Sequence, residues 1–490
     1  MKSDIDLLSY THDRSAHYKD TADEIYNLIN NYTDQEDLLV LYNYFEQTYG
    51  LPQRVVRQKI RQHLGRSYLF KSKQFKSRLH IKNIPRYIFL YSALIYALFF
   101  TKKNKIENYT LIIDNIESPH ELLRFEKLLN LVGANKVLCI TKNIDISEDF
   151  PDYNFVNTKL FRNFKLKDLL GVISSEIFTG IWAVLRVSIK TRVNLFPIAL
   201  QIIHSYLNFK SIFESNKAQY MIQERHYDTN SIKNYLFKQL GGVASTTIQK
   251  NIFQNDPINY YMDIDILFSL GKSGYEDMLH YGGCVSSVKP VGSMFMEYYW
   301  FDKKPSIKKK YDIAILGINT SNEYDRLDSY TDFMDDYYSL SRWAAKLSLE
   351  RPGFKIVLVH HASAGEDFIE SDILKGSNVE VLNKNIDSYK TAFSSKCAIT
   401  YGSTMGYELN AHHLDTFFVD PGYRCSFLPI LGDGAIDKMR IKSYEEFCLV
   451  MDEVVCKDAK FVSNTETDAW CMESSEVARK ICNLIIRKGD

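Results

Sequence analysis

The stretch Cys397-Ala-Ile-Thr-Tyr-Gly-Ser-Thr-Met-Gly-Tyr-Glu408 predicts a short apolar strand, a loop of small residues and a helix that begins at Met405. Thr404 is a suitable N-cap, because its hydroxyl can accept a hydrogen bond from the first helical turn. Gly402 allows a ligand to approach the backbone closely. Since the N–H groups and the dipole at a helix N-terminus attract anions, we expect this loop, with Ser403, to bind phosphate.

Glu408 is predicted one turn into the same helix, on the face that carries Thr404. Its carboxylate could accept hydrogen bonds from the vicinal hydroxyls of a ribose. A phosphate at the cap with a ribose beside it describes a nucleotide at the end of a sheet. The alternative is an ordinary strand-to-helix turn followed by a surface glutamate.

The composition indicates several domains and an uneven distribution of charge. The 490 residues are enough for two or three domains, and 60 Lys and Arg balance 60 Asp and Glu. Residues 1–52 hold three basic and ten acidic residues, whereas residues 53–106 hold fourteen basic residues and no acidic ones. The eight cysteines include no CxxC pair, which favours a reducing compartment. Residues 1–6 lack the apolar core of a signal peptide.

The basic arm, residues 53–106, predicts an association with membranes. Within it, residues 87–100 form an uncharged, Tyr- and Phe-rich run, which is shorter than the ~20 residues that a spanning helix needs. A cationic segment with such a helix suits an anionic cytoplasmic leaflet, so we expect a peripheral protein on the inner face of the cell membrane. The alternative is a buried core helix with a solvated basic flank. Nucleic-acid binding is not expected, because no recognised binding module accompanies the charge.

From residue 107 onward, predicted strands alternate with predicted helices, which indicates parallel, doubly wound sheets. The predicted fold class is α/β, with two Rossmann-like domains that face a cleft. The predicted segments are a helical extension at 1–106, an acceptor-side domain at 107–300, a linker at 301–311, a nucleotide-binding domain at 312–465 and a C-terminal helix at 466–490 that could cross back.

Polar groups of the second predicted domain fall at the ends of its strands. The ends of parallel strands share one edge of a sheet, and such sheets bind ligands there. We therefore expect one nucleotide site to include Gly317, Asn319, His360, His361, Gly402, Ser403, Thr404 and Glu408. One histidine of the pair could donate a hydrogen bond to a phosphate, although a lone histidine is more often structural. No metal is expected, because no carboxylate or cysteine partners have ligand spacing.

A second cluster, Glu224-Arg-His-Tyr-Asp228, follows the strand predicted at 218–223. Converging charges shift pKa values, which suits acid–base or nucleophilic work. We expect the catalytic residues to be Glu224, His226 and Asp228. The alternative is a charged surface loop in which Asp228 or Thr229 caps the next helix. The residues after the following strand, Gln249-Lys250-Asn251, could line the same cleft.

The run Ile399-Thr-Tyr-Gly-Ser-Thr-Met-Gly-Tyr-Glu408, followed by Phe418-Val-Asp-Pro-Gly-Tyr423, resembles the C-terminal domain of bacterial surface-polysaccharide glycosyltransferases of the GT-B fold. It is most similar to the group of Kdo and sialic-acid transferases that use CMP-sugars. In that group a strand-end histidine and a Gly-Ser-Thr loop hold the nucleotide phosphate, and a glutamate one turn later holds the ribose. The positions that match are His360 or His361, Ser403, Thr404 and Glu408. This chain departs from the pattern at Ala362, where the group usually has proline. The resemblance spans residues 108–460 and leaves residues 1–106 uncovered.

The resemblance implies a metal-independent glycosyltransferase without a cofactor. Its donor would be a nucleotide-sugar, such as a CMP-linked ulosonic acid, and its acceptor a capsule or lipopolysaccharide glycan or a lipid-linked precursor. The loop at Glu224 would supply the base or, in a retaining reaction, the carboxylate nucleophile. Two alternatives stay open. One is a polyol-phosphate transferase or nucleotide-sugar epimerase on the same scaffold, and the other is a non-catalytic membrane-associated scaffold of a polysaccharide assembly complex.

Overall fold

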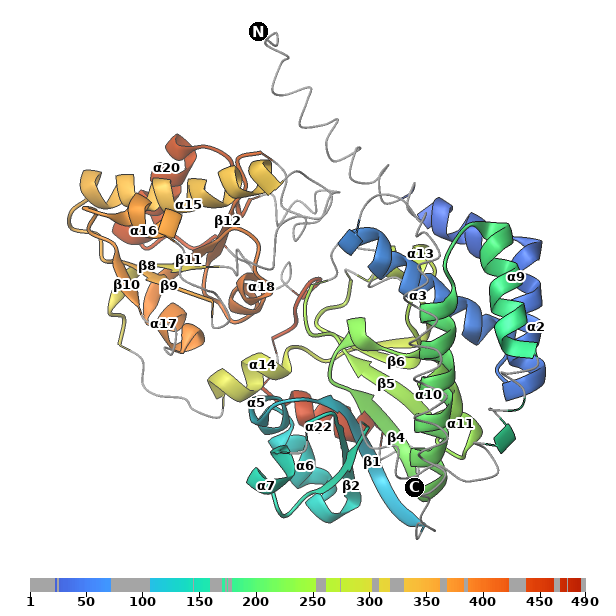
Figure 1. Ribbon diagram of the computed structural model, residues 1–490. Helices are drawn as coiled ribbons and strands as arrows, with labels where there is room; N and C mark the ends of the chain where they lie inside the picture. The colour runs from blue at the N-terminus through green and yellow to red at the C-terminus, as the bar shows by residue number, and fades with distance from the viewer. Residues whose placement is uncertain are drawn as a thin grey trace, which may run out of the picture.

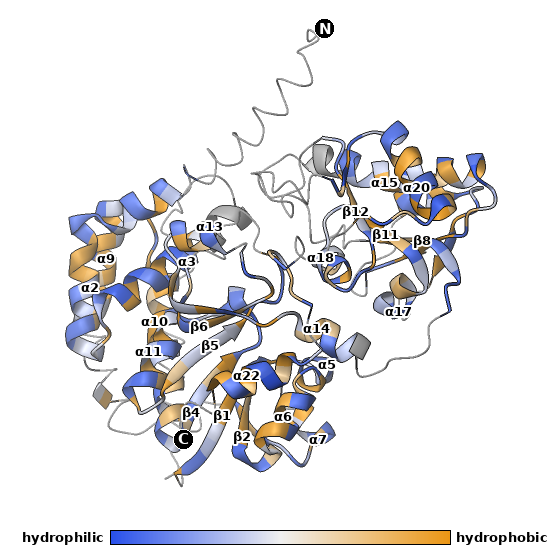
Figure 2. Ribbon diagram, turned by 180° about the vertical axis from the view of Figure 1, so that it is seen from behind, coloured by the Kyte–Doolittle hydropathy of each residue, from blue (hydrophilic) through white to orange (hydrophobic). Residues whose placement is uncertain are grey.

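The protein consists of two α/β domains, each built around a parallel sheet (Figure 1). The computed structural model describes residues 23, 26–71, 106–143, 145–158, 170–171, 174, 179–252, 261–273, 275–301, 308–317, 330–361, 368–382, 387–422, 438–461, 468–473 and 475–485. Figure 2 shows helices that are hydrophobic on one side and hydrophilic on the other, as expected for helices that cover a sheet. The predicted fold class, two doubly wound α/β domains, is confirmed.

The first sheet has seven strands in the order β3-β2-β1-β4-β5-β6-β7, and all neighbouring pairs are parallel. Its strands are β1 (Glu107–Ile116), β2 (Val137–Thr141), β3 (Asn154–Asn157), β4 (Asn216–Gln223), β5 (Ala244–Ile248), β6 (Asp263–Ser269) and β7 (Cys284–Pro290). Strands β2 and β5 are buried at every position, because helices cover both faces of a parallel sheet. The chain runs from β1 out to β3 and returns to β4 on the other side of β1. The topological switch point therefore lies between β1 and β4.

Helices on both faces of this sheet complete the first domain. They include α5 (Pro119–Leu123), α6 (Glu126–Val132), α7 (Ile146–Asp149), α9 (Ile181–Thr191), α10 (Phe196–Ser215), η4 (His226–Asp228), α11 (Ser231–Gln239), α13 (Glu276–His280) and α14 (Met294–Met296). The sequence predicts one helix over 119–132, whereas the structure has two, which meet at Arg124 and Phe125. This junction brings Arg124 to the site described below.

The described part of the predicted N-terminal extension lies against the first domain. Helix α2 (Glu36–Tyr49) packs on α9, and α3 (Gln53–Lys71) packs on α10 and α11. Side chains of both helices, such as Phe45 and Ile60, share one hydrophobic core with Met221 of β4. The apolar run at 87–100 and the rest of the basic arm after residue 71 lie outside the described residues, apart from Ile106. Among the described residues, no helix combines the length and the apolar character needed to cross a membrane.

The second sheet has six parallel strands in the order β10-β9-β8-β11-β12-β13. Its strands are β8 (Tyr311–Leu316), β9 (Ile356–Val359), β10 (Glu380–Leu382), β11 (Ser395–Thr400), β12 (Thr416–Val419) and β13 (Arg440–Ile441). Its helices include α15 (Tyr330–Glu350), α16 (Phe368–Leu374), α17 (Ser388–Phe393), α18 (Thr404–Ala411) and α20 (Tyr444–Lys457). The chain leaves β8 in one direction and returns to β11 on its other side, so a second switch point lies between β8 and β11.

The C-terminal helix α22 (Val477–Ile485) crosses back to the first domain, as the sequence suggested. It packs on α6, and its apolar side chains, such as Ile481, join the core beneath β1. The segment that leads to it runs along the end of β6, where the Lys272 N–H donates to the Asp468 carbonyl (3.0 Å) and the Met472 N–H to the Leu270 carbonyl (2.9 Å). A Cβ atom at Gly271 would lie 2.2 Å from the Ala469 carbonyl oxygen, so this close approach requires glycine.

Candidate functional site

Both switch points carry residues that the sequence singled out, although Glu117 was not among them. In the first domain, Glu117 follows β1 and Glu224 follows β4. In the second domain, Gly317 follows β8, and the loop that starts at Gly402 lies just beyond the end of β11. Because all strands of a sheet run the same way, each pair of residues shares the carboxyl edge where doubly wound sheets bind ligands.

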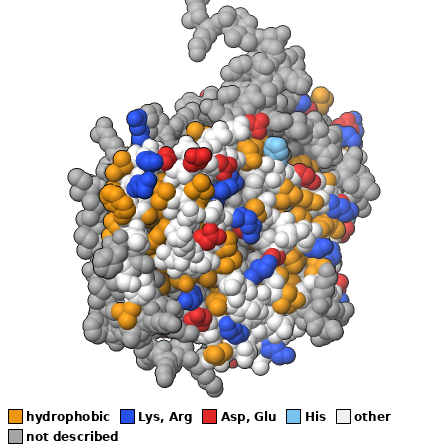
Figure 3. Space-filling model, turned by 90° about the vertical axis from the view of Figure 1, so that its right-hand side faces the viewer, with side chains coloured by type: hydrophobic (Ala, Val, Ile, Leu, Met, Phe, Trp, Pro, Cys, Tyr) orange, Lys and Arg blue, Asp and Glu red, His pale blue; other side chains and the backbone are white. Residues whose placement is uncertain are grey.

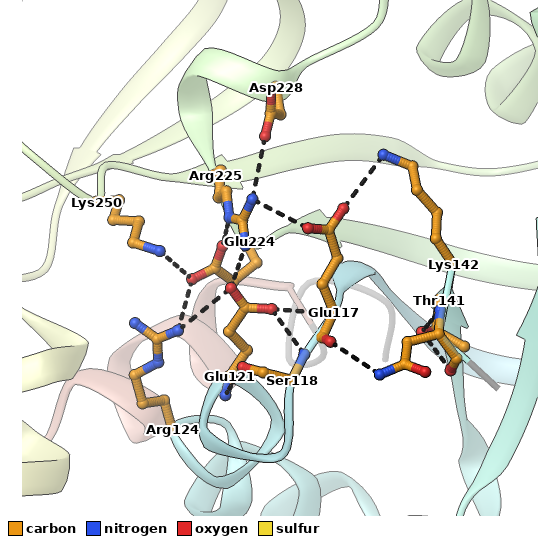
Figure 4. A network of polar contacts seen from close by, with 11 residues as sticks. Glu117, Ser118, Glu121, Arg124, Thr141, Lys142, Glu224, Arg225, Asp228 and Lys250 are labelled. Carbon is orange, nitrogen blue, oxygen red and sulfur yellow. Dashed lines mark hydrogen bonds and ion pairs between the residues drawn. The ribbon is translucent and has the colours of Figure 1, made fainter. Parts of the chain in front are cut away.

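Glu224 is buried at the first switch point and is held by three cations (Figure 4). One carboxylate oxygen lies 3.0 Å from Arg124 Nη2 and 3.1 Å from Lys250 Nζ, and the other accepts a hydrogen bond from Arg225 Nε at 2.8 Å. In this arrangement Glu224 organises cations. The predicted role as base or nucleophile would require one of these contacts to open.

Arg225 joins Glu224 to three further carboxylates. Its guanidinium contacts Glu121 directly and lies 3.5 Å from both Glu117 and Asp228. Burial alone would raise the pKa of Glu121, but hydrogen bonds from the Glu117 backbone N–H and from Arg225 outweigh it and hold the pKa below its ordinary value. Burial opposes the charge of Arg225 as well, yet the contacts with Glu121 and Glu224 raise its pKa above the ordinary value. Glu121 and Arg225 thus keep their opposite charges at neutral pH.

His226 lies in the interior and connects the ends of two strands. Its Nδ1 accepts a hydrogen bond from the Lys250 backbone N–H at 3.1 Å, which ties the end of β4 to the end of β5. The ring proton of the neutral histidine is therefore on Nε2. Burial lowers the pKa of the Lys250 ammonium, and Glu224 opposes that shift. Of the three predicted catalytic residues, Asp228 is the most exposed, with 34% of its side chain accessible.

Sequence reasoning missed several members of this network, namely Glu117, Glu121, Arg124 and Lys142. They come from the loop and helix after β1 and from the end of β2, and Lys142 Nζ lies 3.2 Å from Glu117. The sequence did contain a signal for them. Ser118-Pro-His-Glu121 is a capping box, and both of its reciprocal hydrogen bonds are present. A capping box directly after a central strand marks the carboxyl edge of the sheet.

In the second domain, the structure brings Gly317 and His360 together. Leu316 pairs with both Val359 and Thr400, so the residues that follow these three strands are neighbours. A Cβ atom at Gly317 would lie 3.5 Å from His360 Cα. His361 comes next in the chain and is exposed, whereas Asn319 lies outside the described residues.

A buried glutamate positions the His360 ring. His360 Nδ1 lies 3.3 Å from the Glu370 carboxylate, which also accepts hydrogen bonds from the Tyr337 hydroxyl (3.1 Å) and the Ser341 hydroxyl (2.8 Å). A ring nitrogen that faces a carboxylate carries a proton, so Nε2 is the atom of His360 that could contact a ligand.

The loop at 402–404 differs from the expectation in one respect. The N-cap of α18 is Ser403 and not Thr404, since the Ser403 hydroxyl accepts from the Met405 N–H at 3.2 Å. Thr404 is the first residue of the helix, and its hydroxyl accepts a hydrogen bond from the Ile252 N–H of the first domain at 3.1 Å. The side chain of Thr404 is therefore used to join the two domains.

Glu408 is likewise a contact between domains. It is buried, and its carboxylate accepts hydrogen bonds from the Ser293 hydroxyl, which belongs to the first domain, and from the Tyr389 hydroxyl of α17 at 2.5 Å. It is thus not a surface glutamate, which was the alternative drawn from the sequence. Burial raises the pKa of Glu408 to about 7, although the two hydroxyls act in the opposite direction. A ribose could reach this carboxylate only by replacing one of the hydroxyls.

The raised pKa of Glu408 predicts that stability depends on pH. The folded protein holds this proton more tightly than the unfolded chain, in which the pKa has its ordinary value of 4.5. This contribution is therefore fully present below pH 4.5 and is lost as the pH rises through 7, a loss of about 3 kcal/mol. Urea unfolding at several pH values gives the free energy of unfolding as a curve against pH. Glu408→Gln should make this curve flatter between pH 5 and 8. The exposed Glu453→Gln is the control and should follow the wild type; a curve for Glu408→Gln as steep as that of the wild type would contradict the assignment.

Two short segments of the first domain connect the two switch points. Residues 250–252 run from Lys250, which contacts Glu224, to Ile252, which contacts Thr404. Residues 293–295 run from Ser293, which contacts Glu408, to Phe295, whose ring centroid lies 4.1 Å from the Arg124 guanidinium carbon. The charged network of the first domain and helix α18 of the second are therefore close neighbours.

Comparisons with solved structures find proteins with a similar course of the chain. The UDP-bound MnaA of S. aureus matches with 10% identity over 77% of this chain and 96% of its own, with a TM-score of 0.45. The UDP-GlcNAc 2-epimerase of Neisseria meningitidis bound to UDP-GlcNAc matches with 8% identity over 77% and 100%, with a TM-score of 0.44. The wall teichoic acid polymerase TagF matches with 13% identity over 83% and 96%, with a TM-score of 0.43. Neither a protein-family model nor a curated protein matches the sequence.

Proposed function

We propose that this protein is a glycosyltransferase that uses a nucleotide-sugar donor. The observation that supports this most directly is the meeting of the two switch points through the Ile252–Thr404 and Ser293–Glu408 hydrogen bonds. A nucleotide on the second domain would then place its sugar beside the charged network of the first. The acceptor would be a bacterial surface polysaccharide, such as capsule or lipopolysaccharide, or its lipid-linked precursor.

In the proposed reaction, an acceptor hydroxyl attacks the anomeric carbon of the donor sugar. The bond from that carbon to the phosphate oxygen breaks, and the nucleotide leaves with the electron pair. His360 and the loop at Ser403 would hold the phosphate and stabilise its growing charge. Glu224 or Asp228 would take the proton of the acceptor hydroxyl. No metal enters this scheme, and the independence of metals stays a prediction.

The cations of the first domain support a second candidate, a polyol-phosphate transferase. Arg124, Arg225 and Lys250 gather around one carboxylate. Arginine and lysine side chains in this arrangement suit a phosphate as well as a carboxylate. A phosphate on the substrate could therefore take the place of Glu224. In this case the group transferred, or the acceptor, would itself be phosphorylated.

Nucleotide binding can be tested by thermal shift with CMP, UDP, GDP and CDP. A nucleotide that binds the folded state raises the melting temperature by mass action, and one of the four is expected to do so. His360→Asn and Ser403→Ala should each lower the affinity for that nucleotide at least tenfold. The exposed His413→Asn serves as the matched control and should bind like the wild type. No shift with any nucleotide would contradict the proposal and favour a non-catalytic scaffold.

The reaction type can be tested with the nucleotide-sugar whose nucleotide binds. We expect labelled sugar to move to a glycan or lipid-linked acceptor in membrane extracts, with release of free nucleotide. Release of an isomerised nucleotide-sugar would identify an epimerase instead. Transfer of a phosphorylated polyol from its nucleotide-activated form would identify the second candidate.

A further inference from the structure

Helix α9 presents a hydrophobic side to solvent as well as to the core. Its buried side, which includes Val184 and Val187, packs toward the core of the first domain. On the opposite side, Trp182 is 66% exposed and Ile189 is 60% exposed. These two residues are seven positions apart, so they lie two turns from each other on one side of the helix. Large apolar side chains in such an arrangement are typical of a contact surface.

Positive charges accompany these apolar side chains. Arg186 lies one turn after Trp182, Lys190 adjoins Ile189, and Arg192 follows the end of the helix; all three are exposed. Lys190 Nζ is 2.6 Å from Asp37 of the neighbouring helix α2. Within the part of the chain that the structure describes, Arg186 and Arg192 form no ion pair. Their guanidinium groups therefore flank Trp182 and Ile189 on the exposed side of the helix. Trp182, Arg186, Ile189 and Arg192 are called the α9 face below.

The surface around the α9 face also combines exposed apolar side chains with positive charges. Leu39 and Val40 of α2, the helix packed beside α9, are also exposed. Figure 3 shows the side of the molecule where these helices lie, and hydrophobic side chains share its surface with Lys and Arg side chains, with Asp and Glu between them. Helix α3, which belongs to the basic arm, packs on the same domain, and the arm holds only Lys and Arg among its charged residues.

We propose that the α9 face docks on the surface of an anionic lipid bilayer. Tryptophan prefers the interface between lipid and water, and isoleucine can enter the outer acyl region. Arginines beside them are attracted by anionic headgroups. Charge complementarity selects this occupant over a second copy of the chain, because two copies would oppose guanidinium to guanidinium. This inference is independent of the nucleotide site and of the reaction proposed above.

The test is co-sedimentation of the full chain with vesicles of phosphatidylglycerol and phosphatidylcholine in equal parts. Trp182→Ser combined with Ile189→Ser should lower the partition coefficient at least tenfold, because each side chain loses its apolar contact with lipid. Arg186→Gln combined with Arg192→Gln should lower it about tenfold on these vesicles and leave the weaker binding to pure phosphatidylcholine unchanged. The control is Leu349→Ser combined with Leu449→Ser, two exposed leucines on α15 and α20 of the other domain. This variant should bind like the wild type.

A direct measurement separates the α9 face from the basic arm. Brominated lipids quench the fluorescence of tryptophans that enter the bilayer, and the wild type should be quenched more strongly than Trp182→Phe. Equal quenching, or a Trp182→Ser and Ile189→Ser double variant that binds within twofold of the wild type, would overturn the proposal. A wild type that forms dimers lost in this variant, without binding vesicles, would overturn it in favour of a second copy. Matching melting temperatures would show that the variants are folded.

Discussion

Glu224→Gln is expected to lower the free energy of unfolding by about 3 kcal/mol, because it leaves largely buried cations without their shared carboxylate. Arg124 and Lys250 each lie within 3.1 Å of one oxygen of Glu224, and Arg225 contacts the other. Arg225 keeps its contact with Glu121, so the cost falls mainly on Arg124 and Lys250. Urea unfolding at neutral pH measures the change.

The control for Glu224 is Asp228→Asn in the same loop. Asp228 is partly exposed and lies 3.5 Å from Arg225, so its removal should cost less than about 1 kcal/mol. A second variant tests the cause. Glu224→Gln combined with Lys250→Met removes one of the stranded cations and should recover part of the lost stability. If Glu224→Gln is as stable as the wild type, the cations do not depend on this carboxylate.

The same variant separates two roles of Glu224 in the proposed reaction. If Glu224 takes the acceptor proton, Glu224→Gln should reduce turnover at least a thousandfold below the temperature at which it unfolds, while the nucleotide-induced thermal shift is retained. If Glu224 only organises the cations, turnover should fall much less. Asp228→Asn should then cause the larger loss of turnover.

Much of the fold follows from local patterns in the sequence. The sequence predicts a helix over 388–393 and a strand over 416–419, and both elements have these bounds in the structure. Strand β8, for example, is a mostly apolar run followed by Gly317, which is a strong signal for a strand of a parallel sheet. Two short strands, β3 and β13, were not predicted. Both lie at the edges of their sheets and have only four and two residues, too few for a periodic pattern.

The pairing of site residues could not be predicted, because it depends on contacts between distant parts of the chain. The partner of Arg225 at Glu121 is 104 positions away, and the partner of Glu408 at Ser293 is 115 positions away. The sequence placed Glu224 at a strand end, with Arg225 beside it and Lys250 in the same predicted cleft, but it gave no sign that Arg124 contacts this carboxylate. For the same reason, it assigned Thr404 to the N-cap, whereas the contact with Ile252 uses that hydroxyl.

Lys233→Met is expected to destabilise the first domain by about 3–5 kcal/mol. Lys233 of α11 and Asp114 of β1 form an ion pair in which each side chain is only 2% exposed. Loss of the lysine leaves the Asp114 carboxylate buried without its counter-charge. The effect should extend to the site, because the Asp114 carbonyl accepts the Glu224 N–H at 3.1 Å where β1 meets β4.

The same helix provides the control. Lys238 pairs with Asp265 at 2.6 Å, but half of its side chain is exposed, so Lys238→Met should cost less than about 1 kcal/mol. Asp114→Asn combined with Lys233→Met should restore most of the stability, because the double variant removes both buried charges and leaves none without a partner. Urea unfolding of the four proteins measures these differences. A double variant as unstable as Lys233→Met would show that the lysine contributes through its packing against Phe209, whose ring centroid is 5.4 Å from Nζ, and not through its charge.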